Sequence, residues 1–235
     1  MFDPRQIPTL PPDTELAAVQ LASLHPDALR QRFAQPPVWR PEADADRWLP
    51  SGELVPAAVL VPLVLRQSAE TGLWLPPRVL LTLRTAHLKK HGGQISFPGG
   101  RVEPDDESLT FTALREAQEE VGLHPQRAEV LGHLPAHVTG TGFVVTPVVA
   151  LIQALPHESE QLALQHDPQE VDDVFEVPLD FLMNPRHHRR HVMDVEGNSL
   201  SYFSMPWVPD GVASERFIWG ATAAMLRNFY RFLSA

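Results

Sequence analysis

Residues 97–123 of the chain read FPGGRVEPDDESLTFTALREAQEEVGL, and the rest of the molecule is organised around this stretch. Its second half predicts a helix with two unlike faces, because successive helical residues advance by about 100°. One face is apolar, whereas the other carries Glu116, Glu119 and Glu120. Clustered carboxylates repel one another, so they must stay hydrated, take up protons or bind cations. Hard ions prefer oxygen ligands, and we therefore expect Mg²⁺ or Mn²⁺ at this face.

The residues that flank the acidic helix predict how it begins and ends. Arg115 precedes Glu119 by one helical turn and follows an acidic loop, so we expect it to tie the helix start to that loop. Gly122 fits the left-handed position that follows a helix. Gly99 and Gly100 predict a turn at which main chain approaches a ligand closely. An isolated Glu-x-x-Glu-Glu is usually a solvated helix face, but this combination of features is more specific.

The Gly-Gly pair, the acidic loop and the run Arg-Glu-x-x-Glu-Glu-x-Gly-Leu at 115–123 resemble the Nudix box. That motif is the metal-binding loop-helix-loop of hydrolases that cleave nucleoside diphosphates linked to another group. The interval from Gly100 to Arg115 is one residue longer than the commonest Nudix spacing, so the loop acid is either Asp106 or Glu107. The branch of the family that cleaves coenzyme A shows the same extra residue, with an Asp at the place of Asp106.

A second diagnostic stretch lies directly upstream and resembles the extra signature of the coenzyme A pyrophosphatase subfamily. Its residues are Leu80, Leu81, Thr82, Arg84, Leu88, His91, Gly93, Gln94 and Phe97 to Gly100. Residues 146–149, 170–179 and 218–223 also resemble that subfamily, so the resemblance covers roughly residues 54–233. Thr85 stands where Ser or Ala is expected, and Lys89 stands where Arg is expected. A Lys keeps the charge of an Arg but loses its bidentate fork.

The resemblance implies a hydrolase that cuts the pyrophosphate of coenzyme A or a derivative into 3′,5′-ADP and 4′-phosphopantetheine. The residues agree with this class of reaction, because metals neutralise anionic phosphates and acidify bound water. Glu116 and Glu120, one turn apart, are the expected metal ligands, with Glu119 sharing metal or water binding. The carbonyl of Gly100 is a further expected ligand. Arg115 is expected to orient the acids by hydrogen bonds.

The residue that takes the proton from water is left open between Glu119 and Glu170. Several Nudix enzymes take this base from outside the box, and Glu170 lies in a polar segment just before an expected strand. A surface carboxylate is an equally good interpretation of Glu170. The substrate contacts that the resemblance implies are Arg84, Lys89, His91, Gln94, Gly99 and Gly100.

Two other functions stay open. One is a Nudix hydrolase of ADP-ribose, NADH or dinucleoside polyphosphates, against which the upstream signature argues. The other is a Nudix-fold binding module without turnover, against which the full set of clustered acids argues.

A basic cluster of His187, His188, His191, Arg189 and Arg190 could reach a substrate phosphate or hold a softer metal. We favour a solvated hairpin end for this cluster.

Composition bounds the class of protein. With 235 residues, of which 43% are hydrophobic, the chain can bury a sizeable core, and we expect one main domain. A net charge of −10 argues against nucleic acid as a partner. The longest apolar run, 54–65, is too short to span a bilayer, and the N-terminus lacks a basic region followed by an apolar one. We therefore expect no membrane association and a cytoplasmic location.

The absence of cysteine leaves carboxylates and histidines to carry the chemistry. The expected ligand is a small nucleotide of the coenzyme A type. Nudix hydrolases are often homodimers, so the resemblance also suggests a homodimer.

Periodicity predicts the order of the elements. Residues 1–50 are interpreted as a helical and Pro-rich appendage, with a helix that begins at Asp13 and Thr14 and is broken at Pro26, and residues 51–235 as the Nudix domain. Strands are expected at 54–65, 78–83, 128–134, 143–152 and 171–177, then a short helix at 179–183, a hairpin at 190–205 and a last helix at 218–233. Strands mixed with helices that cover two faces imply an α/β (α+β) fold, a three-layer α/β/α sandwich with a mixed sheet. The resemblance implies that this sandwich is of the Nudix type.

Overall fold

The computed structural model describes residues 3–11, 13, 15–42, 52–88, 92–195, 198–212 and 214–235. In this part of the chain, the central sheet contains eight strands. They are β1 (Val55–Leu65), β2 (Arg78–Arg84), β3 (Ile95–Ser96), β4 (Gly99–Arg101), β5 (Ala128–His133), β6 (His137–Val138), β7 (Phe143–Gln153) and β8 (Val171–Pro178). The α-helices are α1 (Pro26–Ala34), α2 (Leu109–Val121), α3 (Leu179–Leu182) and α4 (Gly220–Ser234), and the 3₁₀ turns are η1 (Pro4–Gln6), η2 (Leu21–Leu24), η3 (Pro125–Arg127) and η4 (Pro185–His187).

The central sheet is mixed. Its main order is β3-β2-β1-β7-β5, while β4 pairs with β1, β6 with β7 and β8 with β2. β1 and β7 run parallel along their whole lengths, and the other described pairs are antiparallel. None of the helices in the described ranges is long and apolar enough to cross a membrane.

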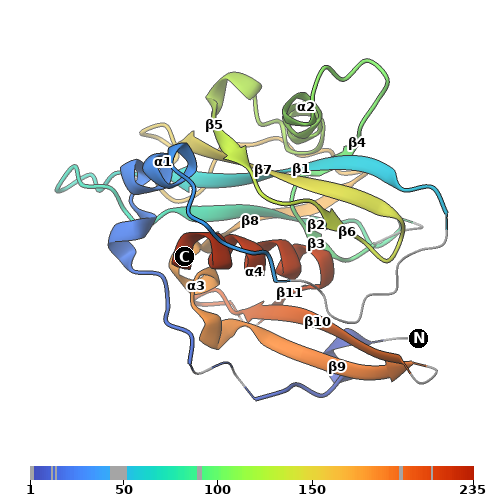
Figure 1. The fold of residues 1–235 in the computed structure, drawn as a ribbon. Coiled ribbons are helices and arrows are strands. Elements are labelled where there is room, and N and C mark those ends of the chain that lie inside the picture. The colour runs from blue at the N-terminus through green and yellow to red at the C-terminus, as the bar shows by residue number, and fades with distance from the viewer. Residues whose placement is uncertain are drawn as a thin grey trace.

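Helices cover both faces of the sheet. The side chains of β1 alternate between the two faces and so contribute to the core on each side. Ala58 and Leu60 belong to a buried cluster with the apolar face of α2, whereas Ala57 and Leu63 belong to a second cluster with α4. Figure 1 shows α2 on one side of the sheet and α4 on the other. The predicted mixed sheet between two helical layers is therefore confirmed.

The five long strands lie within one residue of their predicted bounds. The expected short helix is α3. The prediction omits β3, β4 and β6, because strands of two or three residues have no detectable period. The expected turn at Gly99 and Gly100 is wrong, since both glycines lie in β4 and pair with Val59 and Ala58 of β1.

A second, smaller sheet follows in the sequence. Its strands are β9 (Arg189–Val195), β10 (Asn198–Trp207) and β11 (Arg216–Trp219), in the order β11-β10-β9. The predicted hairpin is β9 and β10. The last helix begins at Gly220 rather than at Ile218, because Ile218 lies in β11 and pairs with Met205 of β10. That pairing is a contact between segments distant in sequence, so local periodicity does not reveal it.

The predicted N-terminal helix is also wrong in its position. Pro26 begins α1 instead of breaking a helix, and the His25 ring accepts a hydrogen bond from the Asp27 N–H. A proline is favoured at the first helical position, because its missing N–H has no partner there in any case. Among the described residues between Asp13 and Pro26, the helical element is the 3₁₀ turn η2. Thr14 lies outside the described residues.

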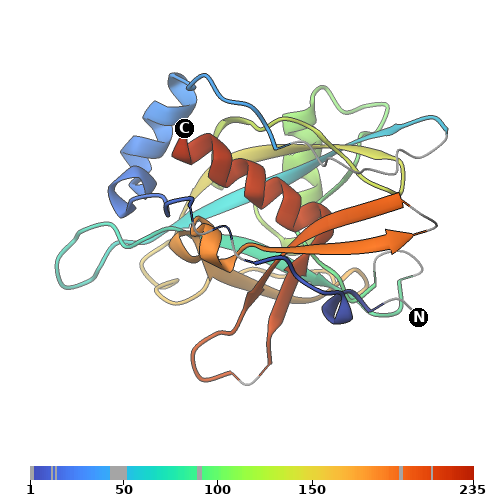
Figure 2. The same cartoon turned by 60° about the horizontal axis from the view of Figure 1, so that its bottom comes forward.

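The described N-terminal residues, 3–11, 13 and 15–42, run over the surface of the rest of the molecule (Figure 2). The Leu10 N–H donates to the Arg190 carbonyl at 2.8 Å, and the Tyr230 hydroxyl donates to the Ala17 carbonyl at 2.8 Å. Figure 2 shows this segment, in blue, passing from β9 to the end of α4 and on to α1. These contacts join the start of the chain to its last elements.

His188 lies in this packed region and is only 3% exposed. Its Nε2 lies 2.7 Å from the Leu182 carbonyl, so this nitrogen carries the proton, and Nδ1 faces the Arg227 guanidinium at 3.3 Å. Burial lowers the pKa of His188 to about 4; Arg227 and His187 lower this pKa further, whereas the Leu182 carbonyl and Asp13 oppose the shift.

His188 should make the stability of the protein depend on pH. The unfolded state binds a proton with the ordinary pKa of 6.5, whereas folded His188 stays neutral down to about pH 4. The unfolded state therefore binds more protons in this window, and the free energy of unfolding falls as pH drops from 6.5 towards 4. We expect the wild type to lose about 2 kcal/mol more than His188→Asn between about pH 7 and pH 5. Urea titrations at both pH values measure this difference, and equal losses would contradict the assignment.

Candidate metal centre and active site

The acidic helix α2 is positioned by its cap and by its apolar face. The Ser108 hydroxyl accepts a hydrogen bond from the Phe111 N–H at 3.1 Å, which supplies an N-cap. The helix ends before Gly122, which has φ 71° as predicted, and the Gly122 N–H donates to the Gln118 carbonyl. The prediction missed Ser108, although a serine ahead of a helical run is a readable signal. Because the opposite face is buried, the acids turn towards β4.

Gly99 and Gly100 bring the main chain of β4 against these acids. A Cβ built on Gly100 would overlap the Glu116 carboxylate, and one on Gly99 would overlap the main chain of Ala58 and Val59 in β1. In this strand the main chain closely approaches a carboxylate of α2, and the expected approach to a ligand stays a prediction.

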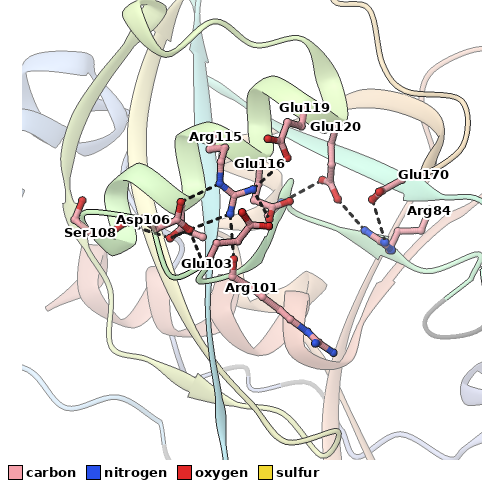
Figure 3. A network of polar contacts seen from close by, with 12 residues as sticks. Arg84, Arg101, Glu103, Asp106, Ser108, Arg115, Glu116, Glu119, Glu120 and Glu170 are labelled. Atoms are coloured by element: carbon pink, nitrogen blue, oxygen red, sulfur yellow. Dashed lines mark hydrogen bonds and ion pairs between the residues drawn. The ribbon is translucent and has the colours of Figure 1, made fainter.

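The loop before α2 is fixed through Asp106. Arg115 donates from Nε to Asp106 Oδ1 and from a terminal nitrogen to Oδ2, both at 3.0 Å. The Thr112 hydroxyl and the Glu103 N–H also donate to Asp106, at 2.8 and 2.9 Å. Hydrogen bonds from Arg115 hold the pKa of Asp106 well below its usual range. Glu107 is exposed, so the loop acid that contacts Arg115 is Asp106 (Figure 3). The role of Thr112 has no sequence signal of its own.

Arg115 also holds two of the helix acids. It donates to Glu116 Oε1 at 3.0 Å and to Glu119 Oε2 at 3.1 Å. The side chain of Glu116 is 17% exposed, whereas that of Glu119 is 60% exposed. Burial raises the pKa of Glu116; Arg115 opposes this shift, and the charges of Glu119 and Glu170 add to it.

Glu120 is the buried acid of the cluster, with 3% of its surface exposed. Its Oε1 accepts a hydrogen bond from Arg84 at 2.9 Å, and its Oε2 accepts one from the Gly99 N–H at 3.1 Å. Burial raises the pKa of Glu120 to about 7, against the effects of Arg84 and the Gly99 N–H, and the charge of Glu116 raises it further. A buried carboxylate with a like charge beside it gains from a cation.

Glu170 reaches the same cluster from the segment before β8. Its Oε2 lies 3.7 Å from an Arg84 terminal nitrogen, and its side chain is 49% exposed. Arg84 thus lies between Glu120 and Glu170, as Figure 3 shows. The structure therefore brings one candidate base, Glu170, to the side of the cluster opposite Arg115, while the other, Glu119, projects from α2 towards solvent.

The remaining predicted substrate contacts are described only in part. Lys89 and His91 lie outside the described residues. The Gln94 carbonyl accepts a hydrogen bond from the Arg84 N–H at 3.0 Å, which places Gln94 beside the strand end that carries Arg84. Arg101 points away from the acids in Figure 3, although its carbonyl accepts a hydrogen bond from Arg115 at 3.2 Å.

The donor set fits a hard divalent cation. Glu116, Glu119 and Glu120 offer only oxygen, and the Gly100 main chain packs against Glu116. Within the described residues, no three His, Asp or Glu side chains form a ready-made metal cage. Mg²⁺ keeps several waters and is commonly held by one or two carboxylates together with substrate phosphates, so it needs no such cage. The residues therefore fit Mg²⁺ or Mn²⁺ bound jointly by protein and substrate.

The histidine cluster near β9 has a structural role. Each imidazole bonds a main-chain carbonyl: His187 that of Phe181, His188 that of Leu182 and His191 that of Ile7. His188 and His191 are both 3% exposed. The interpretation as a solvated hairpin end is wrong for these two, and their bonds leave them unsuited to hold a phosphate or a metal. Tertiary packing of the N-terminal segment and α4 buried them.

Asp106 and Glu107 provide a matched test of the loop acid. Asp106→Asn removes the charge that holds Arg115, so we expect kcat to fall by about tenfold, the lower range for partners that orient metal ligands. Glu107→Gln changes an exposed neighbour and should leave kcat within about twofold of the wild type. Steady-state kinetics at saturating metal measure both. Equal losses in the two variants would contradict the assignment of Asp106.

Comparisons with known proteins agree with this geometry. Residues 56–194 match the model of the NUDIX domain family. Over 173 residues, the chain is 36% identical to the Nudix hydrolase NudL of Yersinia pestis (strain Pestoides F). The aligned residues cover 73% of this chain and 76% of that protein. The NudL protein of Yersinia pseudotuberculosis (serotype O:1b, strain IP 31758) matches to the same extent.

Solved structures overlap with this chain more loosely. A MutT protein from Methanosarcina mazei Go1 has a TM-score of 0.40 at 20% identity, covering 57% of this chain and 83% of that one. The Nudix hydrolase RenU of M. smegmatis has a TM-score of 0.41 at 23% identity, covering 60% and 80%. These overlaps are too partial to bear on activity. The family match and the extent of identity to NudL show that this chain belongs to the Nudix hydrolase family.

Proposed function

We propose that the protein is a metal-dependent coenzyme A pyrophosphatase. Its substrate would be coenzyme A or an acyl derivative, and its products 3′,5′-ADP and (acyl-)4′-phosphopantetheine. The observation that carries the reaction class is the acid cluster in which Arg84 contacts Glu120 and Glu170 while Arg115 contacts Glu116. Residues of the subfamily signature lie next to these acids. Arg84 is the last residue of β2, and Gly99 and Gly100 lie in β4.

The reaction is a hydrolysis of one phosphoanhydride bond. The oxygen of water bonds to one phosphorus, the bridging P–O bond breaks, and the bridging oxygen leaves with the second phosphate. The proton of the water passes to a carboxylate. A metal bound by Glu116 and Glu120 would neutralise phosphate charge and acidify the attacking water.

The other residues of the cluster prepare these ligands. The Gly99 N–H and Arg84 hold the two oxygens of Glu120, so its carboxylate is oriented before substrate arrives. Arg115, itself held by Asp106, does the same for Glu116. Such second partners fix the direction of a metal ligand. The Gly100 carbonyl would add one further ligand.

Glu170 is the base that we propose. It is half exposed, so water reaches it, and its charge acts on Glu116. Arg84 lies beside it, with a terminal nitrogen 3.7 Å from its Oε2. Glu119 is less suited to this role, because its carboxylate is held by Arg115 and projects to solvent.

A substrate panel tests the proposal. The purified protein is incubated with coenzyme A, acyl-coenzyme A, ADP-ribose and NADH in Mg²⁺ or Mn²⁺, and products are identified by mass spectrometry. We expect 3′,5′-ADP from coenzyme A at a higher kcat/KM than for any competitor. Preferred cleavage of ADP-ribose or NADH would overturn the coenzyme A assignment, and no turnover with either metal would indicate a binding module.

A further inference from the structure

The segment that carries Glu170 is anchored by its main chain on both sides. Towards α2, the Asp167 N–H donates to the Glu120 carbonyl at 2.9 Å. Within the segment, the N–H groups of Glu170 and Val171 both donate to the Asp167 carbonyl, at 3.1 and 2.9 Å. The segment is therefore joined to the C-terminal turn of the helix that carries the metal-binding acids.

Towards β2, the anchor is Thr85, the residue that follows Arg84. The Thr85 N–H donates to the Glu170 carbonyl at 3.0 Å, and the Thr85 hydroxyl donates to the Gln169 carbonyl at 3.1 Å. Thr85 is 1% exposed, so its N–H and hydroxyl are shielded from solvent and donate to these two carbonyls. The Thr85 hydroxyl thus links the end of β2 to the loop before β8 through the Gln169 carbonyl.

These two bonds have a geometric consequence for Glu170. The Gln169 carbonyl belongs to the peptide group before the Glu170 Cα, and the Glu170 carbonyl belongs to the group after it. Holding both peptide groups fixes the backbone dihedrals of Glu170 and thus the direction in which its side chain leaves. The side chain itself is 49% exposed and lies 3.7 Å from Arg84, so its own contacts restrain it little.

We propose that Thr85 is a positioning residue that aims the Glu170 carboxylate at the attacking water. This inference rests on the proposed hydrolysis and on Glu170 as its base. Thr85 supplies no group to the reaction; it acts only through the main chain on either side of Glu170. The two neighbouring residues thus have different roles. Arg84 contacts the carboxylates of Glu120 and Glu170, whereas Thr85 holds the main chain of the loop that carries Glu170.

The test compares two substitutions at Thr85 with a matched control. Thr85→Val keeps the shape but removes the hydroxyl, so kcat should fall about tenfold or more at unchanged KM, because small misplacements of a base lower the rate steeply. Thr85→Ser restores the hydroxyl and should return kcat to within about threefold of wild type. Thr222 also donates a buried hydroxyl to a carbonyl, that of Ile95, at 3.0 Å. Thr222→Val should lower Tm as Thr85→Val does but keep kcat.

A double-mutant cycle shows whether Thr85 acts through Glu170. Glu170→Gln alone should lower kcat by about 10²-fold or more, the range for a general base. Adding Thr85→Val to Glu170→Gln should then change kcat by less than about twofold, because there is no base left to aim. An undiminished tenfold loss in the Glu170→Gln background would overturn the inference, and so would a normal kcat in Thr85→Val or in Glu170→Gln.

The same measurements separate this inference from the proposed substrate. Every variant is assayed on the diphosphate that the wild type cleaves fastest in the panel. If that compound is not coenzyme A, the substrate assignment fails while the cycle still decides the role of Thr85. Amide hydrogen exchange at residues 167–171 gives a readout without turnover. Thr85→Val should speed exchange there and Thr222→Val should not, and equal protection in both variants would overturn the inference.

Discussion

Replacing Glu120 by Gln is expected to lower kcat by about 10³-fold, which corresponds to roughly 4 kcal/mol of lost transition-state stabilisation. Glu120 is the most buried of the three helix acids, and its two oxygens are oriented by Arg84 and the Gly99 N–H. The substitution removes the charge that a metal requires and keeps the shape. Because burial raises the pKa of Glu120 to about 7, the folded protein already accommodates its neutral form. We therefore expect the free energy of unfolding to change by less than about 1 kcal/mol.

Glu176 provides the matched control for Glu120. It is also a buried glutamate, 6% exposed, but it lies in β8 of the central sheet, and it accepts two hydrogen bonds from Arg66 at 2.6 and 2.8 Å. Glu176→Gln leaves the buried Arg66 without its countercharge, so stability should fall by about 3 kcal/mol while kcat is retained. Stopped-time product assays and urea titrations measure both quantities. A near-normal kcat in Glu120→Gln would remove Glu120 from the metal site.

Substituting the paired glycines of β4 should separate activity from stability. A Cβ on Gly100 would overlap the flexible end of Glu116, which can swing aside, so Gly100→Ala should fold but displace that ligand. We expect kcat to fall by about 10²-fold, as for other small misplacements. A Cβ on Gly99 would overlap main chain of β1, and Gly99 has φ +156°. Gly99→Ala should therefore lower the free energy of unfolding by about 3 kcal/mol.

Gly140 supplies the control for both glycine substitutions. A Cβ added there meets no atom within 4 Å, so Gly140→Ala should change neither kcat nor stability. Thermal unfolding and steady-state kinetics on the three variants distinguish the effects. A destabilised Gly100→Ala with normal specific activity would show that the β4 main chain does not set the position of Glu116.

The long elements were predictable because their signals are local. The two-faced pattern before Gly122 places the acids on one side and apolar residues on the other, and α2 ends at Val121, directly before that glycine. The apolar runs at 54–65 and 143–152 likewise predicted strands, and β1 and β7 are buried between the two helical layers. By contrast, the prediction that Pro26 breaks a helix is wrong. A proline can either end a helix or begin one, and the His25 cap shows that Pro26 begins α1.

Pairings between distant segments were not predictable in the same way. Gly99 and Gly100 look like a turn in isolation, and β1 makes them a strand. His188 and His191 look solvent-facing within a run of charged residues, and the packing of α4 and the N-terminal segment buries them. In each case the outcome depends on packing against a segment that is distant in the sequence, which the residues on either side do not reveal.

The sequence by itself determined the acidic face of α2, because helical spacing places these residues on one side, and the motif at 97–123 indicated the family by its resemblance to the Nudix box. The tertiary structure decided which acids meet. Asp106 was chosen over Glu107 by the reach of Arg115, and Glu170 joined the cluster through the β2–β8 pairing that ends at Arg84 and Val171. Loop acids differ little in sequence, and only the folded backbone sets their distances from the helix.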